Sequence, residues 1–258
     1  ANLEHRLKIK LCSRGRSGFS LTEEGSIIYE SARRLFSQLE DFRSTVNALH
    51  VQLSGELKLI ASDTISLDER CCFPQVLSEF CEKAPDVYLQ FETAPMSDIE
   101  RMILNGEADV GFIPYHRKLD GLIYHSLYEE TCYLYCSDRH PLFNVAEEDE
   151  IRQGLVNSRS VQAGIQSNPD VAIQMVGLQK AATAYYYETR ATMILSGVYV
   201  GFLPEHYAAR FVDDGRLRKL LPHERCYKLG IAAITHQFSR LNKPRDFFMR
   251  LLQNQIIR

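Results

Sequence analysis

Apolar residues recur at helical spacing along the stretch from residue 21 to residue 53. Steps of four and three residues alternate in this seam, which is the a/d pattern of a coiled coil held for more than three heptads. Thr22 and Glu23 suit the start of the helix and Gly55 suits its end. A helix of roughly 30 residues spans about 45 Å. The pattern predicts a dimerising or domain-linking helix, with a core helix as the alternative. The seam comprises Ile28, Ala32, Leu35, Leu39, Phe42, Val46, Leu49 and Leu53.

Strand and helix patterns alternate after this long helix. Short β-prone runs at residues 57–61, 87–91 and 110–113 are separated by helical segments around 77–80 and 98–105. Strand–helix–strand order at this spacing predicts a parallel sheet with crossover helices. We predict further strands at 122–127, 131–137, 154–157, 184–187, 199–203 and 229–234, and further helices at 189–196 and 244–257. The second part of the chain is therefore predicted to be an α/β domain.

Charge is distributed unevenly along the chain. The first 20 residues hold five cations against Glu4 alone, a net charge of +4, so the other 238 residues carry −7 to give the total of −3. Such a basic head on an acidic body indicates a polyanionic partner, with a solvated basic loop as the alternative. The candidate phosphate contacts are Lys8, Lys10, Arg14 and Arg16.

Motifs for catalysis, metals and membranes are not found in the sequence. The eight histidines are dispersed, and GxSxG, HExxH, Walker and GxGxxG patterns are absent, so we do not expect an enzyme. Seven scattered cysteines without zinc spacing predict reduced thiols, no metal and no cofactor, with a redox switch as the alternative. Without an apolar run of membrane length or a signal-peptide pattern, we expect a cytoplasmic protein with no membrane partner.

The head resembles a known family. The residues Leu3-Glu4, Arg6-Leu7, Leu11, Arg14, Arg16, Gly18, Leu21-Thr22 and Gly25 resemble the signature that follows the recognition helix of LysR-type transcriptional regulators. Residues 105–111, 138–142 and 193–204 resemble segments of that family's effector-binding domain. Departures from the family pattern are Lys8 in place of glycine, Cys12 in place of phenylalanine and Tyr199 in place of a second glycine.

The resemblance implies a domain organisation and a function. Residues 1–20 would be a partial winged helix-turn-helix (the end of the recognition helix and the wing), and residues 21–54 the linker or dimerisation helix. Residues 55–258 would be an effector-binding domain similar to periplasmic solute-binding proteins. Its subdomain I would cover about 55–130 and 228–258, and its subdomain II about 131–227. Such a protein binds double-stranded DNA as a homodimer or homotetramer and responds to a small effector. The alternatives are a solute-binding protein without DNA binding, or a truncated regulator that acts by heterodimerisation.

A two-subdomain α/β fold predicts where the effector binds. Ligands of such folds lie between the halves, outside the carboxyl ends of the strands. Residues 63–66 and 96–97 open helices there, and residues 158–162 are expected to follow a strand. Hydroxyls, helix N-termini and Arg159 favour an anion or carboxylate, although helix caps and a surface charge are the alternative. The candidates are Thr64, Ser66, Met96, Ser97, Tyr115, Arg159, Ser160, Gln162, Gly201 and Phe202.

Overall fold

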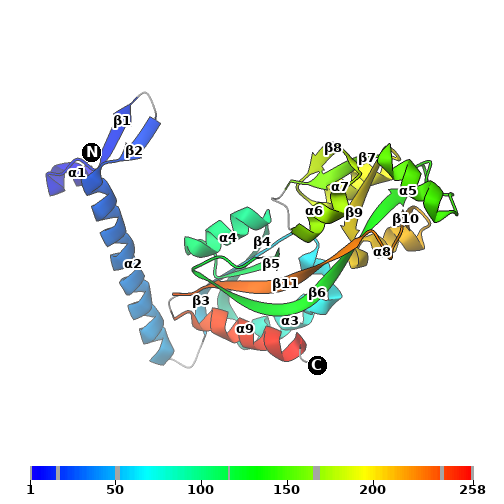
Figure 1. The fold of residues 1–258 in the computed structure, drawn as a ribbon. Coiled ribbons are helices and arrows are strands. Elements are labelled where there is room, and N and C mark those ends of the chain that lie inside the picture. The colour runs from blue at the N-terminus through cyan, green and yellow to red at the C-terminus, as the bar shows by residue number, and fades with distance from the viewer. Residues whose placement is uncertain are drawn as a thin grey trace. The chain divides into compact units, whose positions relative to one another are not determined.

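The computed structural model describes residues 2–15, 18–49, 53–115, 117–164, 169–238 and 241–256 (Figure 1). It contains two compact units: residues 1–53 with residues 240–243, and residues 54–239 with residues 244–258. None of the helices in these ranges combines the length and the apolar character needed to cross a membrane.

The first unit holds the short helix α1 (Asn2–Leu7), a hairpin of β1 (Cys12–Gly15) and β2 (Gly18–Leu21), and the long helix α2 (Glu23–Leu49). Thr22 caps α2, because its Oγ1 accepts a hydrogen bond from the Gly25 N–H at 2.9 Å. A Cβ at Gly25 would lie 1.9 Å from the Leu11 carbonyl oxygen, so only glycine fits there. The predicted long helix is confirmed.

The turn after α1 depends on two charged residues. Lys8 has a φ of 56°, a left-handed conformation that glycine adopts more readily. The carboxylate of Glu4 accepts hydrogen bonds from the N–H groups of Leu11 and Cys12, at 2.9 and 3.2 Å. These bonds lower the pKa of Glu4. Lys8 therefore adopts the left-handed turn at the position where the resemblance placed a glycine.

In the second unit, the described residues form a nine-stranded sheet with the order β4-β3-β5-β11-β6-β9-β7-β8, and β10 pairs with β6. The strands β4, β3 and β5 are parallel, as are β8, β7 and β9, whereas β11 and β6 run antiparallel to their neighbours. The bounds are β3 Ser54–Ala61, β4 Asp86–Thr93, β5 Val110–Tyr115, β6 Leu122–Ser137, β7 Arg159–Ala163, β8 Gln179–Ala184, β9 Tyr199–Pro204, β10 Leu217–Lys219 and β11 Cys226–His236. The predicted α/β fold is confirmed.

Helices cover the sheet in both halves. They are η1 Ile65–Leu67 and η2 Glu69–Cys71 (both 3-10), α3 Phe73–Lys83, α4 Met96–Leu104, α5 Glu148–Val156, α6 Pro169–Met175, α7 Tyr187–Leu195, α8 Glu205–Asp213 and α9 Lys243–Ile256. In the first subdomain, Phe80 of α3 and Phe112 of β5 pack edge-on against Phe248 of α9. In the second subdomain, Leu155 of α5 and Phe202 of β9 are buried in one cluster. Each half thus has its own apolar core.

Two long strands join the halves. Figure 1 shows β6 and β11 running from the first subdomain into the second. They pair antiparallel along most of their length, with a register shift between Ile231 and Ala232. The two strands predicted at 122–127 and 131–137 are therefore one 16-residue strand. The strand predicted at 154–157 is also wrong, because Gly154–Val156 end helix α5, which buries Ile151 and Leu155 at helical spacing.

Candidate effector-binding site

The loops after β3 and β4 meet at one edge of the first subdomain. The Ser62 N–H donates to the Phe112 carbonyl at 2.8 Å, and the Ala94 N–H donates to the Ala61 carbonyl at 3.1 Å. Beyond Ser62 the chain turns through Thr64, whose φ is 72°. The Thr64 hydroxyl is buried and has no hydrogen-bond partner among the described residues. This edge therefore presents a buried, unsatisfied hydroxyl, which is the kind of group that a ligand can satisfy.

The second of these loops opens helix α4. No described side chain caps this helix, whose N-cap residue is Pro95. Ser97 is exposed, whereas Met96 is only 4% exposed and packs with Ile99 and Ile103 in the core. The side chain predicted to contact the effector at Met96 is thus part of the core, because it continues the buried face of α4. The N-terminus of α4 and Ser97 remain available to an anion.

Asp63 links this edge to the second subdomain. Its Oδ2 accepts a hydrogen bond from the N–H of Tyr187, the first residue of α7. Burial raises the pKa of Asp63, although the Tyr187 N–H and the charge of Arg190 act in the opposite direction. Arg190 is 4% exposed and donates to the Phe202 carbonyl at 3.1 Å. A carboxylate from one subdomain therefore lies at a helix N-terminus of the other, above a buried cation.

The position predicted for residues 158–162 is wrong. Arg159, Ser160 and Gln162 lie within β7 and do not follow a strand. Arg159 begins β7, is exposed, and lies 5.1 Å from the ring of Tyr199, the first residue of the parallel strand β9. The Ser160 hydroxyl is buried and donates to the Gln179 carbonyl at 2.9 Å. Arg159 is therefore at the amino end of its strand, away from the carboxyl-end edge that holds the other candidates.

The remaining candidates are in three different settings. Ser66 is half-buried in η1, close in sequence to Thr64. Tyr115 ends β5 and places its hydroxyl 3.5 Å from the Ser126 hydroxyl. Gly201 and Phe202 lie inside β9, and Phe202 is 1% exposed, with its ring 5.2 Å from that of Tyr227. Phe202 thus packs in the core, and its carbonyl holds Arg190 in place.

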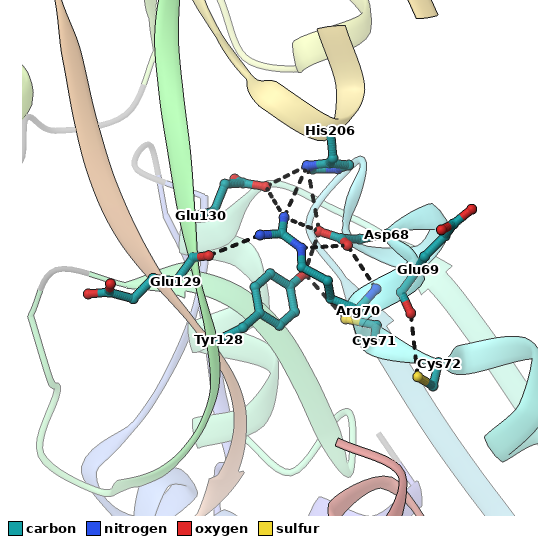
Figure 2. Close-up of polar contacts among 9 residues, drawn as sticks. All are labelled: Asp68, Glu69, Arg70, Cys71, Cys72, Tyr128, Glu129, Glu130 and His206. Atoms are coloured by element: carbon teal, nitrogen blue, oxygen red, sulfur yellow. Dashed lines mark hydrogen bonds and ion pairs between the residues drawn. The ribbon is translucent and has the colours of Figure 1, made fainter. Parts of the chain in front are cut away.

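A second polar feature lies where the subdomains join. It consists of Asp68, Arg70, Tyr128, Glu130 and His206, hereafter the bridging cluster (Figure 2). Asp68 and Arg70 come from the segment around η2 in the first subdomain. Tyr128 and Glu130 come from the crossing strand β6, and His206 comes from α8 in the second subdomain. Three chain segments far apart in sequence are therefore tied together by charged groups.

Arg70 occupies the centre of the bridging cluster. It forms a bidentate ion pair with Asp68, in which Nε donates to Oδ1 at 2.9 Å and Nη2 donates to Oδ2 at 2.6 Å. Its Nη2 also lies 3.6 Å from Glu130 Oε1, and its Nη1 donates to the Glu129 carbonyl at 3.0 Å. Asp68, Glu130 and His206 each have one atom of a kind that binds metal ions, and these three atoms lie within 4.8 Å of one another. Because the guanidinium of Arg70 already supplies a positive charge between these carboxylates, we interpret the cluster as a network of side-chain ion pairs.

The groups around Arg70 have altered acidities. Burial alone would raise the pKa of Asp68, but hydrogen bonds from Arg70 and from the Tyr128 hydroxyl, the latter 2.8 Å long, lower it overall. Burial raises the pKa of Cys71, whose sulfur lies 3.4 Å from the Tyr128 hydroxyl, to about 12. Cys71 is therefore a protonated thiol at neutral pH and a poor nucleophile.

Sequence reasoning missed the bridging cluster. His206 stands at no fixed spacing from Asp68 or Glu130, so the sequence pattern does not indicate that the three residues meet. Asp63 was overlooked for a different reason. It lies inside the loop at residues 63–66, where the neighbouring hydroxyls favour an anionic ligand and a carboxylate does not. A buried-strand pattern that ends in an acid was the signal that could have identified Asp63.

The candidate DNA and dimer contacts lie in the first unit. Lys8 and Lys10 are exposed. Leu35 is 62% exposed and Ile28 is half-buried on α2, where Ile27 and Phe36 are also exposed, at 61% and 68%. Arg16 lies outside the described residues, as do the side chains of Arg14, Leu39, Phe42, Val46 and Leu49. Within the first unit, the described part of α2 thus exposes several apolar side chains.

These features define a class of protein: a two-subdomain α/β ligand-binding domain preceded by a β-hairpin and a long helix. Known proteins narrow the class further. Residues 50–256 match the family described as the LysR substrate binding domain. The transcriptional activator BauR of Pseudomonas aeruginosa is 34% identical over 249 residues, which are 96% of this chain and 81% of BauR. The chain belongs to the LysR-type transcriptional regulators.

Solved structures of the same family have the same fold. The Vibrio cholerae virulence activator AphB superposes with a TM-score of 0.63 at 17% identity, over 98% of this chain and 86% of AphB. CbnR in complex with its target DNA superposes with a TM-score of 0.61 at 17% identity, over 98% of this chain and 87% of CbnR. This chain therefore shares the fold of these two regulators over most of their length, and LysR-type regulators are not enzymes.

Proposed function

We propose that this regulator binds double-stranded DNA as a dimer or tetramer through its basic head. In this proposal it responds to a small carboxylate held between its subdomains, at the loops that follow β3 and β4 and at the start of α7. Because the protein would bind chromosomal DNA, we also propose that it is located in the cytoplasm. The observation that carries the effector class is the Asp63 carboxylate, which accepts the first N–H of α7 from the opposite subdomain.

Several groups at this edge support a carboxylate ligand. The N-terminus of α7 already accommodates one carboxylate, and buried Arg190 adds positive charge behind it. The uncapped N-terminus of α4 and Ser97 offer further donors, and the Thr64 hydroxyl has no partner among the described residues. Burial disfavours the ionised form of Asp63, as its raised pKa indicates. In this proposal an effector carboxylate takes the place of Asp63 at the N-terminus of α7, and the Asp63 side chain moves out of its buried position into water.

A thermal-shift screen of small mono- and dicarboxylates tests this effector class. A hit is then titrated into three variants with opposite expectations. Ser97→Ala should weaken binding about fivefold, the value of one neutral hydrogen bond of about 1 kcal/mol. Asp63→Ala should tighten binding, because it vacates the N–H of Tyr187. Arg159→Ala, at the other end of β7, is the matched control and should bind as the parent does.

Two results would count against this site. In the first, no carboxylate in the screen raises the melting temperature. In the second, a hit binds equally well to Ser97→Ala and Asp63→Ala but is weakened by Arg159→Ala. The second result would return the site to the amino end of β7.

The DNA contacts have a separate test. Binding of duplex DNA is measured by fluorescence anisotropy over a range of salt concentrations. Lys10→Ala and Arg14→Ala should each reduce the slope of log K against log salt by about one, because each removes one phosphate contact. Lys83→Ala, which removes an exposed lysine paired with Glu79 on α3, should leave the slope unchanged. Equal slopes for all three variants would place the DNA surface elsewhere.

A further inference from the structure

We infer that the bridging cluster is a proton-dependent latch between the two subdomains, with His206 as the group that gains and loses the proton. His206 belongs to α8 of the second subdomain, whereas Asp68 belongs to the first. Figure 2 shows the imidazole turned toward the carboxylates of Asp68 and Glu130. The inference concerns the resting chain, so its test requires neither DNA nor an effector.

Distances define the contact that the proton strengthens. Nδ1 of His206 lies 2.9 Å from Oε1 of Glu130 and 3.5 Å from Oδ2 of Asp68. Both carboxyl side chains are nearly inaccessible, at 3% and 2% exposed, and the imidazole is 22% exposed. A charge-assisted hydrogen bond at such a site is about twice as strong as a neutral one. The contact between α8 and the crossing strand is therefore sensitive to the charge on the ring.

The charge balance of the cluster is incomplete without that proton. Asp68 and Glu130 contribute two negative charges, and Arg70 contributes one positive charge. Tyr128 donates its hydroxyl to Asp68 but stays neutral, since burial raises its pKa far above its usual value. A neutral His206 leaves one buried negative charge uncompensated, and a protonated His206 cancels it. Uncompensated buried charge is costly, so protonation stabilises the joined arrangement.

The other charged groups near His206 do not change this balance. Glu205, its neighbour on α8, pairs with Lys219 of β10. Glu129 directs its carboxylate toward Lys228 and offers only its carbonyl to Arg70. Arg70 approaches Nδ1 of His206 to 3.4 Å and so opposes protonation. Burial also opposes it, but the hydrogen bond to Glu130 and the charges of Glu130 and Asp68 outweigh both effects and raise the pKa of His206.

The neutral ring keeps part of the contact. The neutral ring still packs beside the Glu130 carboxylate, with Nδ1 and Oε1 2.9 Å apart, so the proton strengthens the latch and its loss does not abolish the contact. Because the pKa of His206 is raised in the folded chain, its contribution is complete below the unfolded value of about 6.5. That contribution is lost as the pH rises through the folded value. The two subdomains are thus held together more firmly in acid than in alkali.

Hydrogen exchange measured by mass spectrometry can detect the latch on both of its sides. The parent chain and His206→Gln are compared at the same pH, so that intrinsic exchange rates cancel. Glutamine retains a neutral donor but not the charge. At about pH 5.5 the variant should exchange about five- to tenfold faster in residues 65–72 and also in residues 205–213. At about pH 9 the two proteins should exchange alike, because both then have a neutral side chain at this position.

A second carboxylate variant and a matched histidine complete the design. In a Glu130→Gln background, the effect of His206→Gln should no longer depend on pH, because the charge that holds the proton is gone. If Glu130→Gln does not fold, Asp68→Asn serves the same purpose. His223→Gln, which replaces an exposed histidine outside the cluster, should exchange as the parent does at both pH values.

Three outcomes would overturn the latch. The first is equal exchange of parent and His206→Gln at both pH values. The second is a difference of the same size in acid and in alkali, which would show a neutral contact only. The third is a difference confined to residues 205–213, which would show that His206 stabilises its own helix without holding the first subdomain.

Discussion

The long helix α2 and the body differ in where they keep their apolar and charged side chains. On α2, Leu35 and Phe36 are 62% and 68% exposed, and Arg33 forms a 3.9 Å pair with Glu30 in which both side chains are about half exposed. In the body, Phe112 and Phe248 are fully buried, and Arg70 pairs with the carboxylates of Asp68 and Glu130, which are only 2% and 3% exposed. The body therefore keeps these aromatic and charged groups inside its own core, whereas the described part of α2 exposes apolar side chains that another helix can cover.

This difference teaches which contacts hold the fold and which hold the assembly. A buried pair cannot lose one partner without leaving a charge out of water, so it strongly constrains the arrangement of the body. An exposed ion pair between long side chains contributes little to the stability of the fold. Apolar side chains on α2 contribute only when a second surface removes them from water. Substitutions in the two regions should accordingly affect different measurements.

The largest effect is expected on α2. Replacing both Leu35 and Phe42 by Asp would bury charge in the predicted helix–helix interface, at a cost of several kcal/mol. Sedimentation should then show smaller species. Ser37→Asp with Ser44→Asp adds the same charge on the opposite face of the heptad pattern and should leave the oligomer intact. An unchanged oligomer in the Leu35 and Phe42 variant would place the interface elsewhere.

A smaller effect is expected in the body from Arg70→Ala. This change strands the carboxylates of Asp68 and Glu130, and buried pairs broken in this way lose 3–5 kcal/mol. Arg70 is 41% exposed, so water reduces the loss, and we expect about 2 kcal/mol in urea unfolding. Arg152→Ala, which breaks three pairs on an exposed surface, should change stability little. Equal losses for the two variants would contradict the contrast between buried and exposed pairs.

The smallest effect is expected at Lys8. Its left-handed backbone costs a non-glycine residue about 1–2 kcal/mol, part of which glycine loses again through its freedom in the unfolded chain. Lys8→Gly should therefore stabilise the first unit by about 0.5 kcal/mol. Hydrogen exchange of residues 2–15 measures this effect, and Lys10→Gly, without a positive φ, should act in the opposite direction. Destabilisation by Lys8→Gly would show that the lysine side chain makes a contact worth more than the strain.

Periodicity predicted much of the fold. The seam from Ile28 onward specified the long helix, and the buried runs at 57–61 and 110–113 specified parallel strands. The prediction failed for β6, because this strand continues through a polar stretch that resembles the end of a strand. Residues 128–130 are polar, so the crossing strand was predicted as two strands, although its pairing with β11 continues through them. A pattern of apolar and polar residues reports which side chains are buried, and β6 leaves the core of one subdomain and enters that of the other halfway along its length.

The candidate site could be predicted only in the first subdomain, where the strands that precede the two loops were predicted correctly. Thr64 and Ser97 lie at the carboxyl-end edge as expected. Arg159 does not, because it is the first residue of β7, which begins two residues after the predicted strand ends, so Arg159 starts a strand instead of following one. The bridging cluster could not be predicted from spacing, since Asp68, Glu130 and His206 come together only through the crossing of β6 and the placement of α8.

The route of the chain has a consequence for the order in which the protein is made. The second subdomain is entered along β6 and left along β11, so its residues are contiguous. The first subdomain is not contiguous: β11 lies between β5 and β6, and Phe248 of α9 packs on Phe80 and Phe112. On the ribosome, the second subdomain can complete its core while synthesis continues, whereas the first waits with its apolar face open for residues 226–256. The part that is translated earlier therefore finishes folding later, and a nascent chain stalled before α9 exposes the core of the first subdomain to chaperones.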